Sequence, residues 1–101
     1  MDKNKDIYHP NFKASPLPVE IHYLGSFKAS VLFDNDEKLI LNFALLQGRI
    51  KRGPWTEPLF TEEGCRKVSL SESGDIVFPN TSFDILWSYV YGICMESADN
   101  A

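Results

Sequence analysis

Apolar and polar residues alternate with a period of two over three neighbouring segments near the start of the chain. The segments are Val19–Leu24, Phe27–Phe33 and Lys38–Ala44. Such alternation is typical of strands with one buried face and one solvated face. The breaks between them are Gly25-Ser26 and the polar run Asp34 to Glu37. Short turns between consecutive strands predict an antiparallel three-stranded meander.

The middle of the chain has shorter and weaker patterns. Gln47 to Pro58 is interrupted by Gly48 and by Gly53-Pro54, which predicts a loop. The following segment, Pro58–Gly64, has proline near its start, acidic residues early and glycine at its end. That order predicts a single helical turn that stops at Gly64.

A second pair of strands is predicted after this turn. Arg66–Leu70 and Asp75–Phe78 both have strand character, and the four polar residues Ser71–Gly74 separate them. Polar loops of this length that contain glycine are common hairpin connections. The pattern therefore indicates a β-hairpin.

The last segment has the clearest helical pattern. Pro79-Asn80 ends the preceding strand, and Thr81-x-x-Asp84 is similar to a capping box, so we expect the helix to begin after Asn80. Apolar side chains then recur at three- and four-residue spacing and form one stripe: Phe83, Leu86, Trp87, Val90, Tyr91 and Cys94. This stripe is expected to cover the apolar face of the meander. The last turn is expected at Ile93 to Met95.

These elements predict an α+β fold, in which one C-terminal helix packs on a small antiparallel sheet of about five strands, a three-stranded meander plus a hairpin. The 101 residues fit one domain. We place that domain at 19–95, after a flexible N-terminal arm at 1–18 and before a polar C-terminal tail at 96–101. The arm contains three prolines, and Ser15-Pro16-Leu17-Pro18 could alternatively serve as a polyproline ligand.

Charge and cysteine content narrow the function classes. The net charge is −4, and the second half of the chain is the more acidic, which argues against a phosphate-binding surface there. Cys65 and Cys94 form no metal-binding pair, and we expect two buried thiols, with a disulfide as the alternative. The first residues lack the apolar core of a signal peptide, and no apolar run is long enough for a membrane span. We therefore expect a cytoplasmic protein.

The order of these elements resembles the small bacterial domains of domain-of-unknown-function family 2442. The resemblance covers Val19 to Leu86, and its most specific residues are Phe78-Pro79-Asn80, preceded by Leu59-Phe60. Family members usually have tryptophan before the Pro-Asn pair, where this chain has Phe78, and often have glycine after it, where this chain has Thr81. The resemblance implies a small antiparallel α+β fold and no assigned activity. Members of that family occur near toxin–antitoxin-like genes, and some are fused to a helix-turn-helix. Neither association transfers to this chain by residue matching.

The residues suggest no catalytic, cofactor-binding or metal-binding site. His9 lies in the predicted arm and His22 on the polar face of the first strand, and no nucleophile, phosphate-binding or zinc motif accompanies them. Asp34 to Glu37 is rich in oxygen ligands but lacks the spacing of a calcium loop, so a turn is expected. We therefore predict no enzymatic activity, no cofactor and no metal.

The candidate interaction surface has five residues. The loop 49–55 combines the basic Arg49, Lys51 and Arg52 with Trp55, and Tyr89 falls on the helix face turned away from the sheet. We predict a small non-enzymatic bacterial protein-interaction or regulatory domain, antitoxin-like in role, with a protein partner or a homodimer. The alternative is a nucleic-acid-associated accessory domain that uses the basic loop. An exposed loop whose tryptophan folds onto the sheet is the structural alternative to both.

Overall fold

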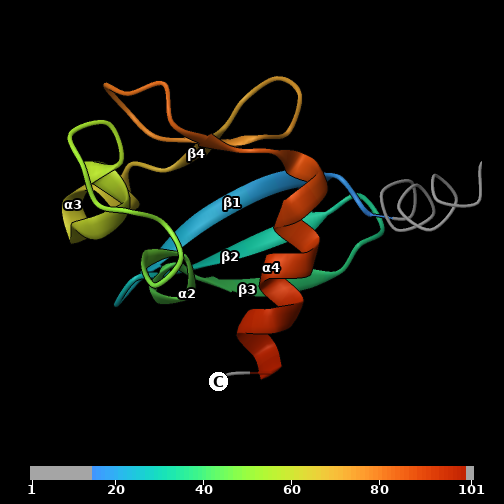
Figure 1. Ribbon diagram of the computed structural model, residues 1–101. Coiled ribbons are helices and arrows are strands. Elements are labelled where there is room, and N and C mark those ends of the chain that lie inside the picture. Colours follow the sequence, from blue (N-terminus) through green and yellow to red (C-terminus); the bar gives the residue numbers. More distant parts are fainter. Residues whose placement is uncertain (1–14, 100–101) are drawn as a thin grey trace, which may run out of the picture.

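The computed structural model describes residues 15–99, which form two small antiparallel sheets and a long C-terminal helix (Figure 1). The first sheet contains β1 (Pro18–Gly25), β2 (Lys28–Phe33) and β3 (Lys38–Asn42), in that order. The predicted meander is confirmed. Its third strand ends at Asn42 and not at Ala44.

The register of this sheet separates an apolar inner face from a mixed outer face. Residues directly opposite one another in an antiparallel sheet point to the same face. Tyr23, Ala29 and Leu41 form one inner row, and Ala29 and Leu41 are fully buried. On the outer face, His22, Ser30 and Ile40 form one row, and Glu20, Leu32 and Lys38 form the next.

Directly after β3 the chain turns into the short helix α2 (Phe43–Gln47), which the sequence did not predict. The Asn42 side chain caps this helix by accepting a hydrogen bond from the Ala44 N–H at 3.0 Å. Phe43 is fully buried, and its N–H still bonds to the Phe27 carbonyl at 2.8 Å, as a strand residue would. The predicted strand end and the start of the predicted loop are therefore helical.

The single helical turn predicted at Pro58–Gly64 is two short helices. These are the 3-10 helix η1 (Glu57–Phe60) and α3 (Glu62–Arg66), and the Thr61 side chain caps α3 by accepting from the Gly64 N–H at 3.0 Å. Gly64 lies inside α3, so the prediction that it ends a helix is wrong. A Cβ at Gly64 would lie 2.3 Å from the Pro58 carbonyl oxygen, so only glycine lets α3 approach η1 this closely.

The second sheet has three very short strands, β4 (Ser69–Leu70), β5 (Ile76–Val77) and β6 (Asp84–Ile85), in that order. The predicted β4–β5 hairpin is confirmed with shorter strands. β6 was not predicted, because its two residues had been placed in the first turn of the helix. Residues 15–99 thus form six strands in two sheets, close to the expected five, and the fold is the predicted antiparallel α+β fold.

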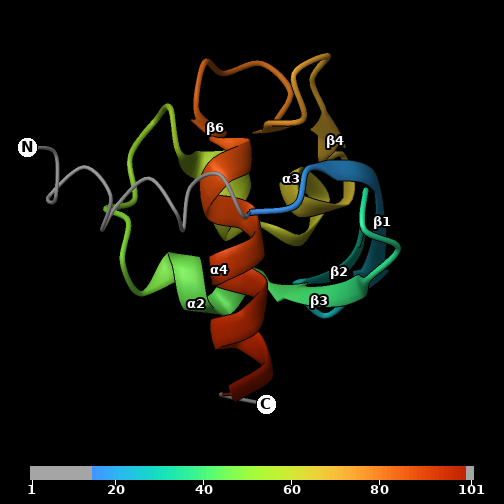
Figure 2. The ribbon, with the colours of Figure 1, turned by 90° about the vertical axis from the view of Figure 1, so that its right-hand side faces the viewer.

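Helix α4 spans Trp87–Asp99 and begins later than predicted. Its first N–H, on Trp87, donates to the Asp75 carboxylate at 2.8 Å, so the cap comes from the β4–β5 turn and not from Thr81. The helix also extends past the expected end at Met95 and includes Glu96. Figure 1 shows α4 crossing the face of the first sheet, and in both views the C-terminal end of the helix extends past β3 (Figure 2).

One hydrophobic core joins both sheets and the helices. Val90 and Cys94 of α4 are fully buried against it, as the stripe predicted, and Trp87 and Tyr91 are half-buried. Phe83 is buried too, although it precedes β6 and is not helical. Leu86 is 48% exposed, so its assignment to the buried stripe is wrong. Of the predicted arm, residues 1–14 lie outside the described residues.

Candidate functional site

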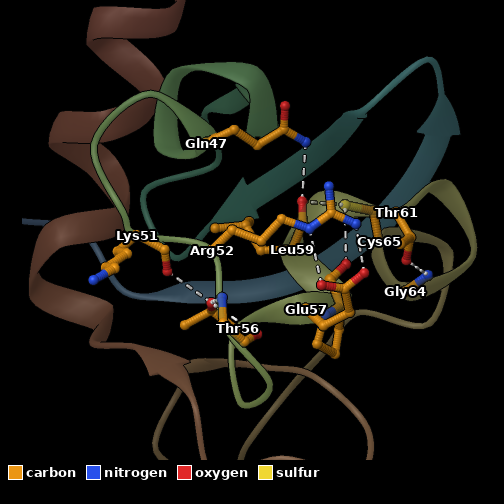
Figure 3. Close-up of polar contacts among 11 residues, drawn as sticks. Gln47, Lys51, Arg52, Thr56, Glu57, Leu59, Thr61, Gly64 and Cys65 are labelled. Atoms are coloured by element: carbon orange, nitrogen blue, oxygen red, sulfur yellow. Dashed lines mark hydrogen bonds and ion pairs between the residues drawn. The ribbon is translucent and has the colours of Figure 1, made fainter.

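The three cations of the basic loop differ in how their charge is satisfied. The Arg49 guanidinium donates to the Glu96 carboxylate of α4 at 2.7 Å. Arg52 binds Glu57 with two hydrogen bonds, at 2.9 and 2.6 Å (Figure 3). These bonds lower the pKa values of the Glu96 and Glu57 carboxyls. Lys51 is exposed, and no carboxylate of residues 15–99 lies within ion-pair distance of its ammonium group.

A buried threonine holds this loop in one conformation. Thr56 is 1% exposed, and its hydroxyl donates to the Lys51 carbonyl at 2.9 Å and accepts from the Gly53 N–H at 2.9 Å (Figure 3). Before the loop, the Gln47 side chain donates to the Leu59 carbonyl at 3.0 Å, which fixes α2 to η1. Hydrogen bonds therefore fix the conformation of the loop, and two of its three cations already have acidic partners.

Trp55 lies at a different place from these ion pairs. Its ring packs edge-on against Phe83, with 5.6 Å between ring centroids, and its carbonyl accepts a hydrogen bond from the Thr81 hydroxyl. It nevertheless remains 58% exposed. The tryptophan ring therefore contacts Phe83, just before β6, and leaves more than half of its surface open to solvent.

The outward side of α4 has a row of exposed residues three positions apart, Tyr89, Gly92 and Met95, which we call the outer row. Tyr89 is 58% exposed and Met95 is 45% exposed. A Cβ built at Gly92 would meet no atom within 4 Å. Since residues three and four apart are neighbours on a helix surface, these three residues form one continuous strip.

The outer row and part of the basic loop belong to one surface. Glu96 lies one turn after Gly92 on the same side of α4, and it holds Arg49 there. The structure thus places Arg49, through Glu96, on the same side of α4 as Tyr89, about two helical turns away. Arg52 and Trp55 have separate surroundings. Met95 was missed because it had been placed in the last helical turn, although its three-residue spacing from Gly92 was visible.

A second polar cluster surrounds the β1–β2 turn. Ser26 and Phe27 both have positive backbone φ values, 55° and 61°, which residues other than glycine and asparagine rarely adopt. The Tyr23 hydroxyl accepts from the Phe27 N–H at 2.9 Å and donates to Glu62 at 3.1 Å, and burial raises the pKa of Tyr23. The Ser26 N–H also donates to Glu62, at 3.3 Å. These bonds hold the strained turn in place, so we assign the cluster a structural role.

The histidine and cysteine side chains show no catalytic arrangement in the described part of the chain. His22 is exposed, 3.7 Å from Glu20. Both cysteines are free and buried, which confirms the expectation of buried thiols, and burial raises both pKa values to about 12. Such thiols stay protonated near neutral pH and are poor nucleophiles. Within residues 15–99, no group of three His, Cys, Asp or Glu side chains could hold a metal ion.

Comparisons of the chain with protein-family models, with curated proteins and with solved structures gave no match. The resemblance to domain-of-unknown-function family 2442 therefore stays a prediction. Among residues 15–99, no helix has the length and apolar character needed to cross a bilayer. The outer row of α4 contains one predicted residue, Tyr89, and one that was missed, Met95. It lies beside the Arg49–Glu96 ion pair.

Proposed function

We propose that this chain is a non-enzymatic protein-interaction domain that binds a partner protein through the outer row of α4. One observation supports this proposal above the others. Tyr89 and Met95 are both about half exposed, and they flank Gly92, where an added Cβ would meet no atom within 4 Å.

The energetics of the outer row favour a binding role over a structural one. A glycine inside a helix costs about 1 kcal/mol relative to alanine, and Gly92 offsets none of this by packing within the described chain. On a binding surface the missing side chain would let a partner approach the helix backbone closely. Tyrosine and methionine are both enriched at protein interfaces, since each combines apolar area with adaptable contacts.

The neighbouring ion pair completes this surface. Arg49 and Glu96 lie beside the outer row with their side chains 52% and 48% exposed, so they would form a polar rim around an apolar centre. The resemblance described above adds the expectation of a bacterial regulator with an antitoxin-like role. That part of the proposal rests on the resemblance alone.

The test is capture of the partner from the native cells, compared among three forms of the full chain. The wild type should retain one stoichiometric protein, and the Tyr89→Ser, Met95→Ser double variant should lose it. Val19→Ser is the matched control, because Val19 is 46% exposed and lies on β1, outside the outer row. Equal retention by the wild type and the double variant would contradict the proposal.

A further inference from the structure

The outer face of the first sheet meets the free edge of β3 in an open groove. Its walls come from the β1–β2 turn, β2, β3 and the end of α4, and they include Leu24, Lys28, Lys38, Ile40 and Ser97. Figure 2 shows the helices gathered on the other side of this sheet. Leu24 and Ile40 are 58% and 43% exposed, so the groove has an apolar floor that the described chain leaves uncovered.

The β3 edge presents backbone groups for pairing. β3 is the last strand of its sheet, with β2 as its neighbour on one side. On the other side, the Asn42 N–H donates to the Ser97 hydroxyl at 3.1 Å. Backbone groups of a strand alternate in direction, so the N–H and carbonyl of Ile40 point to this same side as Asn42. Within residues 15–99 no strand pairs there, and a free edge is a template for an added strand.

Two cations flank the apolar floor. Lys28 and Lys38 lie on the outer face of the sheet, and neither ammonium has a carboxylate of residues 15–99 within ion-pair distance. Among the paired residues of β1, β2 and β3, the carboxylate on this face is that of Glu20, on the far strand β1, where it contacts His22. The groove is thus a basic area on a chain of net charge −4.

We propose that this groove binds an extended acidic segment of a partner protein, which adds to β3 as a fourth strand. The backbone of Ile40 would supply the main-chain hydrogen bonds of strand addition. Since alternate residues of the added strand face the groove, its preferred pattern is acidic, any residue, apolar, any residue, acidic. The apolar side chain would then cover Ile40, and the two carboxylates would lie near Lys38 and Lys28.

The same charges disfavour a second copy of this chain as the occupant. Antiparallel pairing of β3 with β3 of another copy would place Lys38 beside the Asn42 and Lys28 row of that copy. Like charges at such distances destabilise strand pairing. The Asn42 N–H is also already bonded to Ser97, which shortens the free edge. A short foreign strand with opposite charge fits both constraints.

The experiment is an NMR titration of the isotope-labelled full chain with a capped peptide, Glu-Thr-Val-Thr-Glu, at concentrations on the order of 1 mM. We expect amide shifts centred on Lys38 and Ile40. Lys38→Glu should weaken binding about tenfold, whereas Lys51→Glu, an equal charge change on the basic loop, should leave it unchanged. Both lysines are exposed, so neither substitution should affect folding.

Three outcomes would overturn the proposal. The first is that the acidic peptide causes no amide shifts in the wild type. The second is that a peptide with lysine in place of glutamate binds as tightly as the acidic peptide. The third is that a thymidine oligonucleotide of the same charge binds as tightly as the acidic peptide. The proposal is independent of the function proposed for α4. The Tyr89→Ser, Met95→Ser variant should bind the peptide as the wild type does, so failure at one surface is distinguishable from failure at the other.

Discussion

The Asn42 backbone N–H donates a 3.1 Å hydrogen bond to the Ser97 hydroxyl, which joins the end of β3 to the last turn of α4. Ser97 is 3% exposed and also donates to the Ile93 carbonyl at 2.9 Å. One small side chain thus satisfies an edge donor of the sheet and fixes the C-terminal half of the helix over that edge.

Ser97→Ala should destabilise the fold because it leaves the Asn42 N–H without its partner. Removal of one partner from a buried hydrogen bond costs about 1–2 kcal/mol. Urea denaturation should show this as a lower midpoint with an unchanged slope. The control is Ser82→Ala, at an exposed serine before β6, which should change stability by less than about 0.5 kcal/mol. Equal midpoints for the two variants would contradict the assigned role of Ser97.

Two glycine substitutions in helices should have opposite effects. Gly64→Ala would place a Cβ 2.3 Å from the Pro58 carbonyl oxygen and 2.4 Å from the Pro58 Cα, so α3 and η1 must separate. We expect a loss of about 2–3 kcal/mol, typical of overpacking. Gly92→Ala meets no atom within 4 Å and should instead stabilise α4 by up to about 1 kcal/mol. Thermal unfolding of both variants checks the two signs, and a destabilised Gly92→Ala would mean that Gly92 serves the fold.

Stability should fall in acid because three exposed carboxyls have lowered pKa values in the folded protein. Bonds from Asn35 and then Tyr91 lower the pKa of Glu37, and bonds from Arg52 and Arg49 lower those of Glu57 and Glu96. Below the ordinary value of 4.5, the unfolded chain binds more protons than the folded one. The stabilisation is therefore present above that pH and is lost as pH falls through the folded pKa values.

The measurement is the urea midpoint as a function of pH from neutral to strongly acidic. A variant with Glu37→Gln, Glu57→Gln and Glu96→Gln should show a flatter acid limb than the wild type. Added salt should reduce the difference, since exposed ion pairs are screened. An acid limb of unchanged steepness in this variant would assign the acid sensitivity to other carboxyls.

Much of the fold could be predicted from the sequence because its signals are local. The period-two alternation specified the meander, and the turn residues Ser71–Gly74 specified the β4–β5 hairpin. The start of α4 could not be predicted this way. Its cap comes from Asp75, twelve residues before Trp87, and Thr81 bonds instead to the Trp55 carbonyl and the Phe83 N–H. Because the helix begins only at Trp87, Asp84 and Ile85 lie outside it and pair with β5 as strand β6.

The candidate site was predictable only in part, for a similar reason. Helical spacing indicated that Tyr89 faces outward, and the composition of the loop drew attention to Arg49, Arg52 and Trp55. Neither signal shows which side chains meet in space. The Arg49–Glu96 ion pair joins residues 47 positions apart in the sequence, and this contact places the Arg49 side chain beside α4.

Both cysteines should resist thiol reagents while the protein is folded. Cys65 and Cys94 are fully buried with pKa values raised to about 12, so the reactive thiolate is scarce at pH 8. Both should react fully in denaturant. Ser82→Cys adds an exposed thiol as the positive control and should react at once in the native state. Fast labelling of either native cysteine would show that the core opens readily.

The most direct test of the α4 interaction surface is site-specific photo-crosslinking in the native cells. Tyr89 is replaced by benzoylphenylalanine, an aromatic of similar shape, and Val19 is replaced in the same way as the control. If the outer row is the binding surface, irradiation should join the Tyr89 form to one protein and leave the Val19 form unlinked. Absence of a crosslink at Tyr89, or the same crosslinked protein at both positions, would contradict the account.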